Sequence, residues 1–234
     1  MAGSNSTLVS VRGDARLTVA PDLAVLTGVL RTTRDTKVAA LQAAAAELGR
    51  LTDELGSLGG VPLTVDAARP PLGWLAYSAG TEPEHDQDPE TGRYGPTGRM
   101  TASVAVTVNV RAFELLERLG AALAGQESFN VQYVRWDVDP DNPSWPEVRA
   151  AAIRNAISKG RDYAEALGGS LDHLEHIADA GLLGAGDGEP FTRRAPQRFA
   201  AASGAEAETP SLDPVPQELI AVIDARFAAT VAGL

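Results

Sequence analysis

Cysteine is absent from this 234-residue chain, and histidine occurs only three times. The absence of cysteine excludes disulfides, thiol nucleophiles, cysteine-ligated zinc and iron–sulfur clusters. Three histidines leave few ligands for a metal site built on imidazole. We therefore expect the protein to work without a cofactor.

Positive charge is also scarce. Lysine and arginine together number 20 against 31 aspartates and glutamates, which gives a formal net charge of -11. A nucleic-acid-binding surface needs concentrated lysine and arginine to neutralise the phosphates. The composition therefore argues against a nucleic-acid partner.

Long apolar runs are missing as well. No stretch of about 18 apolar residues occurs, so we expect no membrane span. Residues 1–7 have neither the basic segment nor the apolar segment of a secretory signal. These two absences favour a cytoplasmic location.

The composition that remains is that of a globular protein with a substantial core. Hydrophobic residues make up 44% of the chain and charged residues 22%. A chain of this length can bury a core without metal or disulfide staples. We expect one large domain, or one domain that contains a pseudo-repeat.

Alternation of apolar and polar residues predicts most of the strands. The predicted strands cover residues 9–19, 23–32, 61–67, 102–110, 129–138 and 171–183. Gly13, inside the first strand, is typical of a β-bulge. The second strand is apolar on both faces, which is typical of a central position in a sheet.

Apolar residues at three- and four-residue steps predict the helices. The predicted helices cover residues 38–58, 113–123 and 144–167. Asp35 or Thr36 can cap the first helix. Ser144, followed three residues later by Glu147, forms a capping box for the last.

The order of these elements suggests an internal repeat, because strand–helix–strand occurs over 23–78 and again over 99–138. Residues 79–98 are acidic, rich in proline and glycine and without periodicity, which predicts a long solvated loop. Residues 184–210 have the composition of a disordered insert. Residues 217–231 fit both a strand and a helix, and their periodicity does not decide between them.

Several segments coincide with the pattern of a known family. They are residues 9–15 (VSVRGDA), 21–24 (PDLA), 147–156 (EVRAAAIRNA), 159, 163–164 and 167–168. Together they resemble the SIMPL-domain family over residues 7–231, which we expect to form a single domain.

The resemblance implies an α+β fold, with mainly antiparallel sheets and helices packed on their faces. It also favours a strand over 217–231. Members of this family are often exported and linked to stress responses, and some resemble ring-forming or channel-like oligomers. Most have no known activity, so the resemblance supplies no catalytic residue.

Asp137, Asp139 and Asp141 have the alternating carboxylates of a calcium-binding loop. An EF-hand requires glycine at the position of Asn142 and glutamate at that of Val148. The three aspartates are therefore weak metal candidates, and a plain connection from strand to helix is the stronger interpretation.

His173 and His176 do not form an HExxH motif, and on a regular strand their side chains point to opposite faces. The chain also lacks the Gly-x-Ser-x-Gly nucleophile elbow. The sequence therefore offers no catalytic constellation.

Trp74 and Tyr77 precede the acidic segment, and Trp145 lies at a predicted helix start. Exposed aromatic residues often mark an interface, so these three are candidate contacts for a ligand or a partner. Packing into the core explains the same residues equally well.

Three functions follow from these observations. The leading hypothesis is a non-enzymatic protein that associates with itself through sheet edges or helix faces and serves as a scaffold or a stress-related binding protein. The alternative is a module for a small ligand or a peptide, in which Trp74, Tyr77 and the acidic segment form a lid over the sheet. A hydrolase that uses Asp137 and Asp139 has only the proximity of these residues in its favour.

Overall fold

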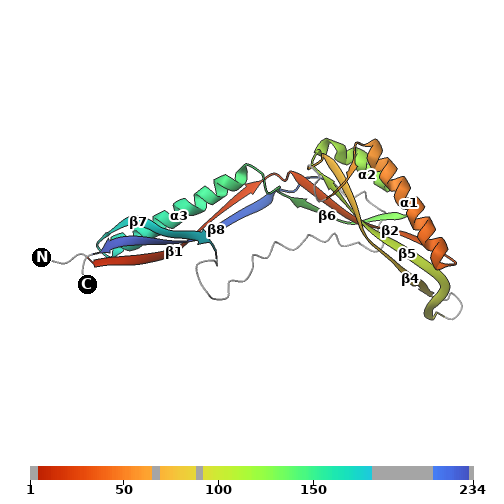
Figure 1. The fold of residues 1–234 in the computed structure, drawn as a ribbon, viewed down its shortest axis with the longest axis horizontal. Helices are drawn as coiled ribbons and strands as arrows, with labels where there is room; N and C mark the ends of the chain where they lie inside the picture. The colour runs from red at the N-terminus through yellow and green to blue at the C-terminus, as the bar shows by residue number, and fades with distance from the viewer. Residues whose placement is uncertain (1–4, 65–68, 88–91, 181–212, 232–234) are drawn as a thin grey trace. The chain divides into compact units, whose positions relative to one another are not determined.

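The computed structural model describes residues 5–64, 69–87, 92–180 and 213–231. Within them the chain is an α+β protein with mainly antiparallel sheets, as predicted (Figure 1). We expected a single domain over 7–231, whereas the described residues group into two compact units. The first, which we call the terminal unit, contains residues 5–20, 139–180 and 216–231, and the second, the central unit, contains 21–138 and 213–215.

The terminal unit is a three-stranded antiparallel sheet with one helix on one face. The strand order is β1 (Asn5–Val19), β8 (Gln217–Val231), β7 (Ser170–Asp179), and the helix is α3 (Ser144–Ala166). Residues 217–231 are thus a strand, as the family resemblance implied. Their ladder with β1 runs without interruption over the full length of both strands.

Small residues let α3 lie very close to β1. The buried positions of the helix recur every four residues and are Val148, Ala152, Ala156, Gly160 and Ala164. A Cβ atom on Gly13 would lie 2.2 Å from the backbone oxygen of Ala152. The register is continuous through Gly13, so the predicted bulge is wrong. Glycine is needed here because the helix backbone occupies the place of a side chain.

The central unit is a five-stranded sheet with two helices on one face. The strand order is β3 (Val61–Pro62), β4 (Leu72–Gln87), β5 (Tyr94–Val110), β2 (Leu23–Arg34), β6 (Phe129–Asp137). Only the short β3–β4 pair is parallel. The helices are α1 (Lys37–Ser57) and α2 (Leu116–Ala124), the latter preceded by a 3-10 turn over Phe113–Leu115.

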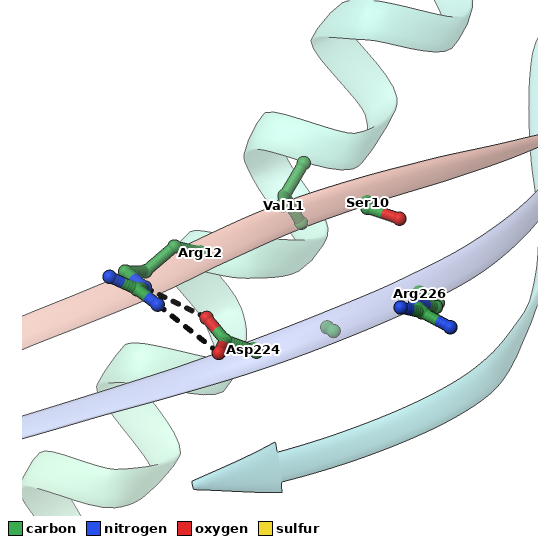
Figure 2. A pocket seen from close by; sticks show the side chains of 6 residues that line it. Ser10, Val11, Arg12, Asp224 and Arg226 are labelled. Carbon is green, nitrogen blue, oxygen red and sulfur yellow. Dashed lines mark hydrogen bonds and ion pairs between the residues drawn. The ribbon is translucent and has the colours of Figure 1, made fainter. Parts of the chain in front are cut away.

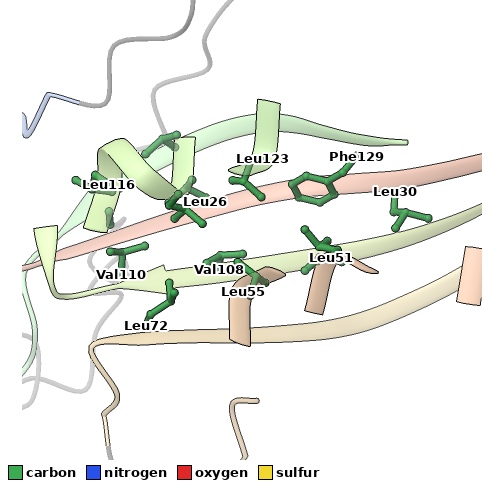
Figure 3. Close-up of a cluster of buried hydrophobic side chains, with 14 of the residues drawn as sticks. Leu26, Leu30, Leu51, Leu55, Leu72, Val108, Val110, Leu116, Leu123 and Phe129 are labelled. Carbon is green, nitrogen blue, oxygen red and sulfur yellow. The ribbon is translucent and has the colours of Figure 1, made fainter. Parts of the chain in front are cut away.

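The predicted repeat is present in this order of elements. One half is β2–α1–β4 and the other is β5–α2–β6, and the strands of the two halves alternate in the sheet. This interleaving is the split βαβ arrangement. Its core, shown in Figure 3, joins Leu26, Leu30 and Val108 of the strands to Leu51 and Leu55 of α1.

Residues 79–98 are not the solvated loop that their composition predicted. β4 continues to Gln87, and β5 begins at Tyr94, so most of this segment is a long β-hairpin. Cross-strand contacts hold it: the Thr97 hydroxyl donates to Glu84 at 2.7 Å, and Arg99 lies 3.5 Å from the same carboxylate. Acidic residues and Pro83 are tolerated because they lie on an exposed edge strand. The predicted disordered insert, 184–210, lies outside the described residues.

The helix starts differ in part from prediction. Thr36 caps α1, since its hydroxyl accepts a hydrogen bond from the Ala39 amide at 3.2 Å. Ser144 does not cap α3 but is its first residue, and the Asn142 side chain accepts from the Ser144 amide at 2.8 Å. None of the helices among the described residues has the length and apolar character needed to cross a bilayer.

Gly13→Ala is expected to lower the free energy of unfolding by about 1–3 kcal/mol, because the new methyl group must displace the α3 backbone. Urea denaturation measures this loss. The matched control is Gly49→Ala in α1, where a Cβ meets nothing within 4 Å. There the change is expected to stabilise by about 0.5–1 kcal/mol. Equal stability of Gly13→Ala and the native protein would contradict the close approach.

Candidate functional site

Two of the three candidate metal-ligating aspartates accept hydrogen bonds from nearby backbone amides. The Asp137 carboxylate accepts a hydrogen bond from the Val138 amide at 2.9 Å, and the Asp139 carboxylate accepts from the Asp141 amide at 3.1 Å. Asp137 belongs to the central unit, whereas Asp139 and Asp141 belong to the terminal unit. Across the described part of the chain, no three histidine, aspartate or glutamate side chains are grouped to hold a metal.

Trp145 fixes the start of α3. Its indole N–H donates to the Asp139 carbonyl at 3.0 Å, and the Arg149 guanidinium lies 5.6 Å from the ring centre. The residue is half-buried. These contacts give Trp145 a local role in joining the preceding connection to the helix.

Trp74 and Tyr77 lie on β4 but have different surroundings. Trp74 is opposite Val108 and packs against the core of the central unit. Tyr77 lies at a β-bulge between Ala76 and Ser78 and is 57% exposed. Alternation along the strand explains the difference, because residues three apart point to opposite faces, and Trp74 lies on the face that packs against the core.

The two strand histidines lie on the same face of their sheet, so the predicted opposite orientation is wrong. His173 is opposite Ala228 and His176 is opposite Arg226, two residues apart on β8. The register shifts twice in β7, and these bulges change the alternation of its side chains. Both imidazoles are exposed, and His173 lies 3.3 Å from Glu175.

The face of the terminal sheet opposite α3 carries a ladder of ion pairs. Arg12 donates to both carboxylate oxygens of Asp224, at 2.8 and 3.2 Å (Figure 2), and this hydrogen bonding raises the pKa of Arg12. Four residues further along β1, Arg16 lies 3.4 Å from Glu218. A depression of about 380 Å³ lies over Ser10, Arg12, Asp224 and Arg226. Val11 and Ala225 complete its lining, and it is open to solvent, which suits a solvated surface better than a small-molecule site.

Edge strands expose backbone N–H and C=O groups, and the terminal unit covers or disrupts both of its edges. Lys159 of α3 donates to the Arg12 carbonyl and to the Asp14 carboxylate, each at 2.9 Å. Asn155 accepts from the Asp14 amide at 3.2 Å. These bonds use the outward backbone groups in the middle of β1. The opposite edge, β7, carries the two bulges, which disfavour pairing with another strand.

Among the described residues, the central sheet has an edge without such cover. β3 pairs only with Gly73 and Trp74, and none of the other described strands joins β4 on this side from Leu75 onward. We call residues 75–82 the β4 edge. Its residues 75–81 carry no formal charge, and both Leu75, at 43%, and Tyr77 are strongly exposed.

The outward backbone groups of the β4 edge follow from the ladder. The Leu63 amide donates to the Trp74 carbonyl at 2.7 Å, so the backbone N–H and C=O of Trp74 point away from β5. Alternate residues share this direction, and the bulge at Tyr77 shifts the alternation by one. Ala79 and Thr81 therefore point their N–H and C=O groups outward. No hydrogen bond among the described residues reaches these groups.

The sequence pointed to Tyr77 as a candidate contact but did not predict the open strand edge on which it lies. The signal was present, since residues 75–81 are uncharged and free of proline. The proline and acidic residues that follow have the composition of a loop, so the uncharged run was not recognised as part of a strand.

The model of a family described as SIMPL, protein of unknown function (DUF541), matches residues 9–227. The matched range includes parts of both the terminal and the central unit. A search of curated proteins finds no match to the chain.

Lys159→Met is expected to raise the pKa of Asp14. The Lys159 ammonium lowers this pKa, first through its hydrogen bond and then through its charge. The contact therefore stabilises the fold above pH about 3.9, the ordinary value for aspartate, and the contribution is lost as the pH falls through the lower folded-state pKa. Titration of the carboxyl resonance by NMR measures the change.

The matched control for this titration is Lys37→Met, which removes the only other lysine of the chain. It is expected to leave the pKa of Asp14 unchanged. If Lys159→Met also leaves that pKa unchanged, the contact between Lys159 and Asp14 does not form in solution.

Proposed function

Because the chain belongs to the SIMPL family, whose function is unknown, we propose its role from its own surfaces. We infer that the protein is a non-enzymatic scaffold or binding protein that associates with copies of itself through the β4 edge. The observation that carries this proposal is the contrast between that edge and the two edges of the terminal sheet.

An uncovered strand edge is a template for another strand, and natural proteins usually block such edges. The terminal sheet uses α3 side chains on one edge and bulges on the other. The β4 edge has an uncharged run with outward groups at Ala79 and Thr81. If a second copy of the chain covers the β4 edge, the protein has no need to block this edge with its own side chains.

The charge distribution supports association at this place. Copies of a chain with a net charge of -11 repel one another, and contact through an uncharged run limits the repulsion. Glu82, Glu84 and Asp86 follow directly along β4. These carboxylates disfavour further strand addition toward the hairpin tip, which favours a limited assembly over open-ended aggregation.

A peptide-binding module is the second candidate, and it would use the same groups. The sequence suggested that the acidic segment forms a lid over the sheet. Most of this segment is instead part of β4 and β5, so it cannot serve as a lid. An extended peptide can nevertheless add as a strand to an open edge. The oligomeric state of the protein distinguishes the two candidates.

Native mass by size-exclusion chromatography with light scattering is expected to show an oligomer at micromolar concentration, at low and at high salt. Backbone hydrogen bonds and apolar contacts depend little on salt, unlike contacts between exposed charges. Ala79→Lys is expected to shift the protein to the monomer, because lysine on an edge strand opposes pairing.

The matched control is Ala45→Lys, which makes the same charge change at an exposed position of α1. It is expected to keep the native mass. A native protein that is monomeric under all these conditions would overturn the proposal and leave the peptide-binding candidate. An oligomer that survives Ala79→Lys would place the interface elsewhere.

A further inference from the structure

We infer that two copies pair their β4 edges antiparallel about a two-fold axis at Gly80, which joins both five-stranded sheets into one. This inference rests on the proposed self-association and adds the register and symmetry of the contact. An interface between identical strands related by a two-fold axis must be self-complementary. The β4 edge meets this requirement in one register.

Backbone geometry selects the register. In an antiparallel pair, residues that exchange hydrogen bonds alternate with residues that do not. Ala79 and Thr81 carry the outward groups, so Ala79 of each copy exchanges bonds with Thr81 of the other. Gly80 then faces Gly80 of the second copy as a pair without hydrogen bonds, with Cα atoms about 4.5 Å apart.

The bulges limit the alternatives. Register shifts in β4 fall between Ala76 and Ser78 and between Pro83 and His85. The regular stretch is therefore 78–83. Pro83 has no N–H to donate, so the part that can pair fully with a second copy is 78–82, and its centre is Gly80. An axis at Ala79 would place Thr81 opposite Tyr77, the bulge residue, where the backbone directions no longer match.

Side chains also fit this register. Gly80 has no side chain at the closest approach, and a Cβ built there would meet only the Ser103 hydroxyl oxygen, at 3.9 Å. Glu82 lies opposite Ser78 of the second copy, a potential donor to its carboxylate. Tyr77 comes next to Pro83 of the second copy, which gives its exposed ring an apolar neighbour.

Like charges remain separated. In this register the two copies of Glu82 are four residues apart along the strand direction, or about 13 Å. That distance exceeds the Debye length of about 8 Å at physiological ionic strength. Glu82 lies at each end of the paired stretch, and Glu84 and Asp86 lie beyond it.

Gly80→Cys tests the register directly, because the native chain has no other thiol. A Cα separation of about 4.5 Å falls within the range that a disulfide spans. Under mild oxidation most of this variant is expected to run as a covalent dimer on non-reducing gels. The matched control, Gly56→Cys, introduces an exposed thiol on α1 where a Cβ meets nothing within 4 Å, and it is expected to stay uncrosslinked.

Hydrogen exchange of the native protein supplies a second test that needs no substitution. The amides of Ala79 and Thr81 are expected to exchange more slowly as protein concentration rises. A native oligomer that Ala79→Lys dissociates but that does not form the Gly80→Cys crosslink would overturn the register and leave association through the β4 edge intact. A native oligomer without protection of these amides would place the interface elsewhere. A native monomer would overturn both.

Discussion

A strand at the edge of a sheet carries backbone N–H and C=O groups that need partners, and this constraint connects the main features of the protein. In the terminal unit, α3 lies so close to β1 that Lys159 and Asn155 reach its outward groups. That closeness depends on Gly13 and on the small residues of the helix. The close packing of α3 on β1 thus both forms the core of the terminal unit and covers the β1 edge.

The central unit provides partners for the backbone groups of its inner strands but not for those of the β4 edge. Its two strand–helix–strand halves interleave, so β5 and β2 occupy protected inner positions and the long β4 is left near one margin. β3 covers only the first part of β4. The split βαβ arrangement serves many unrelated functions, so the fold does not identify the role of the protein. The uncovered β4 edge is the local feature from which a role can be argued.

Regular periodicity made much of the fold predictable from sequence. The alternation of 102–110 and the leucine spacing of 38–58 reflect one buried face each, and the corresponding elements are β5 and α1. Composition was less reliable. Residues 79–98 have the prolines and carboxylates of a loop, yet 79–87 and 94–98 pair with each other and with the sheet as strands. Ser144 has the right spacing for a capping box, but it is the first residue of α3, and its amide donates to the Asn142 side chain.

The sequence by itself determined the α+β class, the family pattern and most of the core, because hydrophobic periodicity is a local property of the chain. Tertiary structure alone decided which strand edges are covered. That outcome depends on the order of strands in each sheet. It also depends on side chains more than a hundred positions away in the sequence, such as Lys159 of α3, which donates a hydrogen bond to the Arg12 carbonyl of β1. It also depends on bulges, which place His173 and His176 on one face. These features arise from pairing between distant segments, which no single stretch of sequence encodes.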